Sequence, residues 1–288
     1  MSRTKTTRKP RGGRGKRGGE IAKMDGVLYN KAEYGKENRR HWMSKMRLDK
    51  LLSTLGEGTR SEVRDLVRAG RVTVDGKTVK DAGMQVDAEG SEIAVAGRVL
   101  SYKAVRHVML HKPQGVLTAA RDKKQKTVMD LLPPMYAAMG AMPAGRLDKD
   151  TEGLLIITSD GQLAHRIISP KKDVSKIYYA RLDAPLGPAD AKAFEAGLHI
   201  KDGDGEFDAK PARLEILSED GCEVRIHVSE GKYHQVKRMT AARGANVIYL
   251  RRERIGALDL DGNLKPGEWR ELTEEEVKLL ETDPEAEA

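Results

Sequence analysis

The first 44 residues limit what this chain can fold into, because they concentrate its positive charge in a stretch that begins without apolar periodicity. They hold 13 of the 52 Lys/Arg and 4 of the 44 Asp/Glu, so the remaining residues carry 39 Lys/Arg against 40 Asp/Glu. The opening run RTKTTRKPRGGRGKRGG cannot bury a core, and we expect residues 1–44 to form a disordered basic tail. The folded part of the chain should therefore begin near residue 45.

A flexible polycation gains affinity for phosphate backbones by releasing counterions, and it does so without reading a base sequence. The tail is therefore expected to favour nucleic acid, although a basic extension can also serve only to keep a protein soluble. An anionic membrane surface fits the tail less well, because no amphipathic apolar face accompanies the charge.

Composition excludes several classes of protein for the whole chain. No stretch approaches the roughly 18 consecutive apolar residues that a membrane helix needs, and the N-terminus lacks the apolar segment of a signal peptide. The single cysteine, Cys222, excludes an internal disulfide framework, and the seven His residues show no metal-ligand spacing with it. We therefore expect a cytoplasmic protein of two domains, without a metal and without membrane association.

Two short helices are predicted at the start of the folded part. Apolar residues recur at helical spacing over 48–55 and stop at Gly56, and a second set over 63–67 stops before Gly70. Either Thr59 or Ser61 can cap the second helix. Beyond it, valines alternate around Asp75-Gly76, which predicts a short β-hairpin.

The second predicted helix carries a row of arginines. Arg60, Arg64 and Arg68 lie at i, i+4 and i+8, so their guanidinium groups follow one side of the helix. That side faces either solvent, as most such rows do, or the phosphates of a nucleic acid.

This stretch resembles the S4-type RNA-binding domain. The resemblance covers about residues 46–92 and depends on Arg47-Leu48-Asp49, Arg60-Ser61 and the run from Gly70 to Gly76. In that family the helical pair presents its basic face to structured RNA. The resemblance implies an RNA-binding domain with its linker over residues 45–103, and it implies RNA contacts from Arg47, Arg60, Arg64, Arg68 and Arg71.

The second domain, expected over residues 104–275, alternates strand and helix patterns. Strands are predicted at 107–110, 154–157, 175–182, 214–217, 222–228 and from 247. Helices are predicted at 128–132, at 189–198, over a segment that the run 230–239 opens and Gly244 ends, and at 273–280 with Thr273 as its N-cap. We expect an α+β fold whose sheet is mixed and largely antiparallel. Residues 276–288 should be the end of the last helix and an acidic tail.

The most informative segment is PAGRLDKDTEGLLIITSDG, residues 143–161, in which a polar loop precedes a buried strand. Asp148 is therefore expected at a rigid strand edge, where a positioned carboxylate can act. A glycosidase would need two carboxylates, and we expect Asp148 and Asp150 to point to opposite faces of a strand. The residues alone leave open whether Asp148 is a catalyst or a turn residue.

Four spaced motifs resemble those of the RNA pseudouridine synthases, and with the S4-type domain they resemble most the branch that acts on small-subunit ribosomal RNA. They are Gly145-Arg-Leu-Asp-x-x-Thr151-x-Gly-Leu-Leu155, Lys112-Pro-x-Gly115, Lys176-x-Tyr178, and Gly231-x-x-x-Gln235-Val-Lys-Arg-Met239. The resemblance spans about residues 46–275. It implies isomerisation of a uridine to pseudouridine, which calls for no cofactor.

The resemblance also implies roles for individual residues. Asp148 would be catalytic, either attacking C1′ or taking a proton from C2′, and Tyr178 would stack on the flipped uracil and help remove the C5 proton. Lys237 or Arg238 would lie near Asp148 and favour its ionised form. Arg146 would either fill the space of the flipped nucleotide or bind its phosphate. Further substrate contacts are expected from Thr151, Lys176, Gln235, Val236 and Arg238, and a further RNA contact from Lys112.

Three functions are carried forward. The first is a monomeric pseudouridine synthase for small-subunit ribosomal RNA, acting on an assembly intermediate of that subunit. The second is a non-catalytic RNA-binding or ribosome-assembly factor, and the third is a synthase acting on large-subunit ribosomal RNA. A degenerate catalytic loop would favour the second, but Asp148, Tyr178 and Lys237 are all present.

Overall fold

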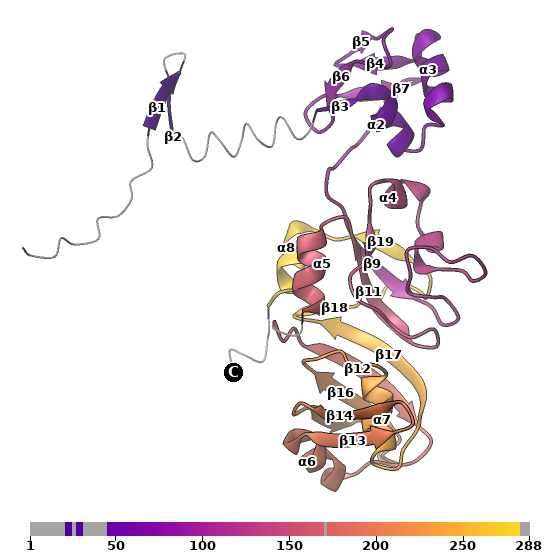
Figure 1. The fold of residues 1–288 in the computed structure, drawn as a ribbon, viewed down its shortest axis with the longest axis vertical. Helices are drawn as coiled ribbons and strands as arrows, with labels where there is room; N and C mark the ends of the chain where they lie inside the picture. Colours follow the sequence, from indigo (N-terminus) through magenta and orange to yellow (C-terminus); the bar gives the residue numbers. More distant parts are fainter. Residues whose placement is uncertain (1–20, 25–26, 31–44, 170–171, 283–288) are drawn as a thin grey trace, which may run out of the picture. The chain divides into compact units, whose positions relative to one another are not determined.

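The structure is a computed structural model that describes residues 21–24, 27–30, 45–169 and 172–282 (Figure 1). In the N-terminal region, β1 (Ile21–Met24) and β2 (Val27–Asn30) pair as antiparallel strands. The predicted disorder of residues 1–44 otherwise lies outside the described residues, as does the acidic end at 283–288. The chain divides into two units, residues up to 51 with 64–101 and residues 52–63 with those from 102 onward, and each is described by itself.

Glycines end both helices of the N-terminal domain, as the sequence predicts. Helix α2 (Leu48–Thr54) is followed by Gly56 with φ +86°, and α3 (Arg60–Arg68) is followed by Gly70 with φ +69°. The positive φ is strained for any residue with a Cβ, so glycine is the residue that closes each helix. Thr59 is the N-cap of α3, because its Oγ1 accepts from the Glu62 amide at 3.3 Å and its own amide donates to Glu62 Oε2 at 2.7 Å.

The predicted hairpin is present and is closed by a two-residue turn. Strands β4 (Val72–Val74) and β5 (Lys77–Thr78) flank Asp75 and Gly76, which have φ of +50° and +73°. Positive φ at both positions is the signature of a type I′ turn, which matches the twist of a hairpin. The sheet continues from β4 to β7 (Ile93–Val95) and β8 (Arg98–Leu100), and β3 (Lys45–Arg47) pairs separately with β6 (Gln85–Asp87).

Nine described strands of the second unit form one mixed sheet, which confirms the predicted fold class. Its order is β15-β16-β12-β17-β11-β9-β19, with β10 beside β11 and β18 beside β17. Every described pairing in it is antiparallel except that of β11 with β17. The strands are β9 (His107–Lys112), β10 (Met142–Pro143), β11 (Glu152–Thr158), β12 (Lys176–Leu182), β15 (Arg213–Ile216), β16 (Glu223–Val228), β17 (Val247–Ile255), β18 (Leu258–Asp259) and β19 (Trp269–Glu271).

Short helices connect these strands, and several elements go beyond the sequence prediction. The helices are the 3₁₀ helix η1 (Val128–Leu131), α4 (Pro134–Ala138), α5 (Gly161–Ile168), α6 (Pro188–Ala196), α7 (Gln235–Ala241) and α8 (Glu274–Leu279). A separate hairpin, β13 (Leu198–Asp202) with β14 (Gly205–Ala209), lies between α6 and β15. The hairpin, the helices α4 and α5, and the short strands β10, β18 and β19 were not predicted from the sequence. The predicted domain boundary at 275/276 falls inside α8.

The parallel pair requires a glycine. Gly153 on β11 has φ +108°, and a Cβ built there would lie 2.2 Å from the carbonyl oxygen of Arg252 on β17. No side chain can be accommodated so close to another backbone. The glycine therefore lets two strands about a hundred residues apart meet directly beside the loop that carries Asp148.

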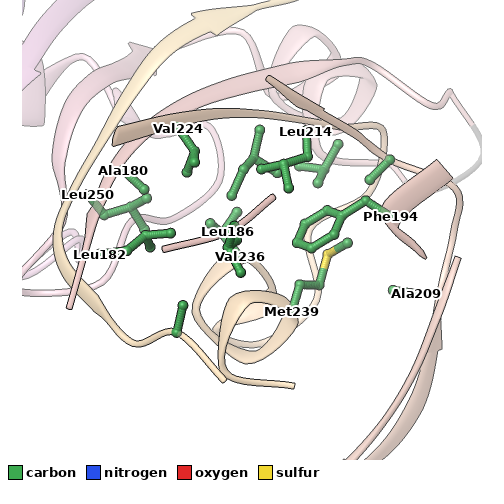
Figure 2. Close-up of a cluster of buried hydrophobic side chains, with 14 of the residues drawn as sticks. Ala180, Leu182, Leu186, Phe194, Ala209, Leu214, Val224, Val236, Met239 and Leu250 are labelled. Atoms are coloured by element: carbon green, nitrogen blue, oxygen red, sulfur yellow. The ribbon is translucent and has the colours of Figure 1, made fainter. Parts of the chain in front are cut away.

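Two layers of helices explain the apolar run on β11. One face of β11, with Leu154 and Ile156, packs on residues of α5 and on Leu280, and the other, with Leu155 and Ile157, packs on η1 and its neighbours. A strand buried on both faces has a continuous apolar sequence. Elsewhere, strands β12, β15 and β16 are covered by α6 and α7 (Figure 2), where Phe194 and Met239 are fully buried.

Candidate active site

A cavity of about 810 Å³ lies in the second unit, beside the end of β11. It is lined by the loop before β11, by β12 and β17, and by the segment that leads into α7; lining residues include Gly145–Lys149, Thr151, Lys176, Tyr178, Glu230–Lys237, Leu250 and Arg252. The cavity therefore brings together residues from three of the four motifs singled out in the sequence.

The loop that carries Asp148 is held from both sides by hydrogen bonds. Thr118 Oγ1 donates to the Leu147 carbonyl at 2.7 Å and accepts from the Leu147 amide at 3.2 Å. The Thr151 amide donates to the Asp148 carbonyl at 3.1 Å, which closes a turn around Lys149 and Asp150. Asp148 is thus fixed at the cavity wall, with its side chain 31% exposed.

Lys112 is buried, whereas the family resemblance predicts that it contacts RNA. It is fully buried, and its Nζ donates to the carbonyl oxygens of Pro113, Lys149 and Thr151 at 3.0, 3.3 and 2.8 Å. Burial lowers the pKa of Lys112 to about 8. A side chain without exposed surface cannot contact RNA, so the structure corrects the predicted RNA contact of Lys112. Lys112 instead holds the loop of Asp148 in place through its hydrogen bonds to the carbonyl oxygens of Lys149 and Thr151.

Lys237 is the basic group beside Asp148. Its Nζ lies 3.1 Å from Asp148 Oδ2 and 2.6 Å from Asp150 Oδ1. Burial acts to lower the pKa of Lys237, but its hydrogen bonds to the two carboxylates outweigh this and raise that pKa. Burial likewise acts to raise the pKa of Asp150, and the bond and charge of Lys237 reverse it to a net lowering. A protonated Lys237 therefore faces both carboxylates.

This arrangement corrects the premise that Asp148 and Asp150 point to opposite faces of a strand. Both precede β11, which begins at Glu152, and Asp150 lies in a turn. The alternation of a strand does not apply to them, so one ammonium group bridges both.

His234 provides a second group at Asp148. Its Nε2 lies 3.5 Å from Asp148 Oδ1, and its ring stacks on that of Tyr233 with centroids 3.8 Å apart. His234 has φ +49°, an uncommon conformation for a residue with a side chain, and it precedes α7 directly. The bend places His234 and Lys237 on the same carboxylate.

Gln235 and Val236 are buried and line the cavity at the start of α7. Gln235 Nε2 donates to Glu230 Oε1 at 2.7 Å, and Gln235 Oε1 accepts from the Lys232 amide at 3.0 Å. Gln235 thus fixes the segment that leads into α7, and the side chain of Val236 joins the neighbouring hydrophobic core.

Arg238 pairs with Asp202 and not with Asp148. Its guanidinium donates to both carboxylate oxygens of Asp202 at 2.7 and 2.8 Å and lies over the ring of Phe207, with Cζ 4.6 Å from the ring centroid. It is 8% exposed and does not line the cavity. Of the two basic residues considered as partners of Asp148, Lys237 makes the contact, and Arg238 instead ties α7 to the hairpin β13–β14.

Tyr178 and Lys176 project into the cavity from β12, two residues apart and therefore on one face of the strand. The Tyr178 hydroxyl accepts a hydrogen bond from Arg252 Nη1 at 3.4 Å. Lys176 Nζ donates to the Val174 carbonyl at 2.6 Å, and burial, followed by the charge of Arg252, lowers the pKa of Lys176 to about 8. Arg146 is exposed at the cavity wall, and Thr151 is buried in it.

Comparison with known proteins identifies the family. Residues 106–242 match the family model for RNA pseudouridylate synthase, and residues 46–93 match that of the S4 domain. The chain is 48% identical over 237 residues to the uncharacterized RNA pseudouridine synthase YtzG of Bacillus subtilis, a match that covers 82% of this chain and 98% of the relative. The chain belongs to the RNA pseudouridine synthase family.

Other relatives agree with this assignment. The ribosomal small subunit pseudouridine synthase A of Vibrio cholerae is 44% identical over 235 residues, covering 82% of this chain and 99% of the relative. A solved structure described as a pseudouridylate synthase is 37% identical, covers 82% of this chain and 99% of its own, and has a TM-score of 0.56. The protein is thus an RNA pseudouridine synthase with an S4 domain.

The S4 domain of the synthase carries the predicted arginines on its surface. Arg47, Arg60, Arg64, Arg68 and Arg71 are all exposed. Arg47 and Arg64 form ion pairs with Asp49, which is buried. Asp49 Oδ2 lies 2.8 Å from Arg47 Nη2 and 3.7 Å from Arg64 Nη2. Arg68 pairs with the exposed Asp65 at 2.7 Å.

Two residues that line the cavity of the synthase, Arg252 and His234, were not predicted from the sequence. Arg252 lies in the run RRERIG, in which neighbouring arginines are indistinguishable until the strand register is known.

No cluster of His, Cys, Asp and Glu suited to a metal ion occurs in the described ranges. Within the same ranges, no helix is long and apolar enough to span a bilayer.

Proposed function

We propose that this synthase isomerises a uridine of small-subunit ribosomal RNA, with Asp148 as its catalytic residue. The observation that carries the proposal is the placement of Asp148 at the cavity wall, 3.1 Å from Lys237 Nζ and in the same cavity as Tyr178. Relatives that are named small-subunit synthases match nearly their full length, which supports the choice of RNA.

The chemistry follows from these groups. Asp148 either attacks C1′ of the target uridine or removes the C2′ proton, and in both routes the N1–C1′ bond breaks and the base takes the bonding electrons. The base then turns and C5 bonds to C1′. In the first route this bond displaces Asp148 from C1′, and in the second the proton taken by Asp148 returns to C2′. The C5 proton passes to a base in the cavity and N1 gains a proton, so the net change is an isomerisation. Lys237 holds the carboxylate oriented through an ionic hydrogen bond.

The target uridine must leave its stack to reach this cavity, and the ring of Tyr178 offers a face for the flipped base. Thr151, Lys176, Gln235, Val236 and the exposed Arg146 line the space around that base and its phosphate. The S4 domain would dock on structured RNA through its arginines. We further propose that the synthase works as a monomer in the cytoplasm on a small-subunit assembly intermediate.

Asp148→Asn tests the catalytic assignment. The amide keeps the size of the side chain but can neither attack C1′ nor act as a base, so we expect turnover to fall by more than about 100-fold while RNA binding persists. Pseudouridine would be mapped in small- and large-subunit ribosomal RNA from cells lacking the gene and complemented with either version. Activity within about tenfold of wild type would exclude Asp148 as the catalyst.

The same mapping distinguishes the alternatives. A pseudouridine lost only from large-subunit RNA would reassign the substrate. Loss of no pseudouridine, with ribosome assembly restored equally by wild type and Asp148→Asn, would favour a non-catalytic assembly factor.

A further inference from the structure

A buried arginine that pairs with no carboxylate of the described residues lines the active-site cavity. Arg252 is 4% exposed; its Nε donates to the Leu154 carbonyl at 2.8 Å, and its Nη1 reaches the Tyr178 hydroxyl at 3.4 Å. Nη2 is buried and has no hydrogen-bond partner among the described residues. Its neighbours on β17 differ, because Arg251 pairs with Glu253 at 2.6 Å and Arg254 with Asp259 at 2.5 Å.

Lys176 adds a second cation to the same place. It lines the same cavity, and its Nζ has one described hydrogen bond, to the Val174 carbonyl. The opposing charge that acts on Lys176 is that of Asp173, which pairs with Lys210 at 2.6 Å.

The carboxylates that line the cavity are engaged elsewhere. Asp148 faces Lys237, Glu230 accepts from Gln235, and Asp122 accepts from two backbone amides. Arg252 and Lys176 thus form no ion pair with a carboxylate within the described part of the chain.

A buried cation and an unused buried donor each cost free energy unless a ligand supplies the missing partner. Thr151 also lines this cavity, and its buried Oγ1 has no hydrogen-bond partner among the described residues. Two lining residues with unsatisfied polar atoms, one of them a cation, favour an occupant that is polar and carries negative charge on this side.

The proposed reaction produces such an occupant. When the N1–C1′ bond breaks, both bonding electrons stay with the base, and the resulting uracil anion spreads its charge over N1, O2 and O4. This holds whether Asp148 forms a bond to C1′ or removes the C2′ proton, because the base is the leaving group in both routes.

We propose that Arg252, with Lys176 beside it, binds the uracil base in the cavity and stabilises the negative charge that the base acquires on N-glycosidic cleavage. Arg252 is a suitable residue because guanidinium stays protonated and its N–H groups are fixed in one plane. Fixed donors aimed at developing charge in a site closed to water lower a reaction barrier strongly. The inference rests on the proposed function, since it assigns a role within that reaction.

The test varies the leaving group. An RNA fragment containing the mapped target would be made with either uridine or 5-fluorouridine at that position, because fluorine withdraws electrons and stabilises the uracil anion. Single-turnover loss of the target nucleoside and the Kd for RNA would be measured for wild type, Arg252→Met and Arg252→Lys. Arg254→Met is the matched control, since it removes an arginine from the same strand outside the cavity.

We expect Arg252→Met to slow uridine cleavage by about 100-fold, the effect of losing one donor to a developing anion, with RNA Kd within about twofold of wild type. The 5-fluorouridine substrate should recover about tenfold of that loss, so the ratio of its rate to that of uridine rises. The cleavage rate of Arg252→Lys should lie between those of wild type and Arg252→Met, and the rate of Arg254→Met should match that of wild type.

An equal loss on both substrates would overturn the proposal and leave Arg252 as a residue that only positions Tyr178. If Arg252→Met fails to fold, Lys176→Met replaces it, with a smaller rise in the same ratio expected and an unchanged ratio again counting against the proposal. A wild-type protein that converts no uridine would instead refute the proposed function. The two failures are therefore distinguishable.

Discussion

The S4 domain and the active-site cavity both contain cationic side chains, but these side chains differ in their exposure to water. Arg60, Arg68 and Arg71 are exposed to water, whereas Lys112 and Arg252 are buried among backbone carbonyls and aromatic rings. Exposed charges are screened by salt and contribute affinity, while buried ones resist screening and act on particular atoms. The comparison predicts that salt should govern RNA binding, whereas substitution and pH should reveal the cavity.

After Asp148→Asn, the largest effect from this comparison is expected from Lys237→Met. This change leaves Asp148 and Asp150 close together without their shared ammonium, so the carboxylate loses its orientation and its stabilised charge. We expect turnover to fall by about 100-fold with RNA binding little changed. Steady-state kinetics alongside Lys192→Met, a lysine on α6 outside the cavity, would check this; a loss confined to KM would place Lys237 in RNA binding instead.

Next in size is the double substitution Arg60→Gln with Arg68→Gln. Neither residue supports a buried group, and Arg68 pairs only with exposed Asp65 among the described side chains, so folding should persist. Affinity for the cognate RNA should fall about tenfold, and the slope of log affinity against log salt should flatten by about one for each phosphate that the variant no longer binds.

Lys77→Gln with Lys80→Gln removes the same charge from exposed positions of that domain and serves as the control for this test. If both pairs weaken binding equally on cognate and scrambled RNA, the arginine row makes no shape-specific contact. The S4 domain would then bind RNA by net charge alone.

A smaller effect is expected from deleting residues 2–23, which removes nine Lys/Arg and one Glu. Cognate and scrambled RNA should lose affinity in equal proportion, and the salt dependence should flatten, because the deleted charges act through counterion release. The modified uridine should stay the same. Titrations at several salt concentrations, followed by mapping, check both points, and a shifted modification site would mean that the tail takes part in recognition.

The smallest effect concerns Lys112 and pH. Its folded-state pKa of about 8 lies below the ordinary 10.5, so between these values the unfolded chain holds the extra proton. The free energy of unfolding of wild type should therefore rise with pH across this window relative to Lys112→Met, which has no proton to lose. Denaturant unfolding at about pH 7.5 and about pH 9.5 measures this; parallel changes in the two proteins would show that Lys112 is not held in a destabilised charged form.

The sequence predicts best the features that follow from local physical rules. Gly56 and Gly70 end the two S4 helices, Asp75-Gly76 closes the hairpin, and residues 154–157 form a strand buried on both faces. Each of these depends on neighbours within a few residues or on continuous burial.

The features that could not be predicted depend on long-range register. Arg252 reaches the cavity only through its pairing opposite Tyr178, and Lys112 is buried only because the Asp148 loop folds over it. The choice between Lys237 and Arg238 was also beyond the sequence, because it depends on Asp202, which belongs to the unpredicted hairpin β13–β14. Helix α5 was not predicted, although its buried residues Leu163, Ala164 and Ile167 recur at helical spacing.

The pairing of Gly153 with Arg252 affects how this domain folds while it is being synthesised. The strands it joins are separated by about a hundred residues, so the pairing closes a long loop, and contacts of that kind form slowly. On a ribosome, the Asp148 loop would emerge well before β17, and the cavity would lack its Arg252 side until that strand was synthesised. The order of synthesis thus leaves Asp148 without a complete cavity around it until nearly the whole domain has been made.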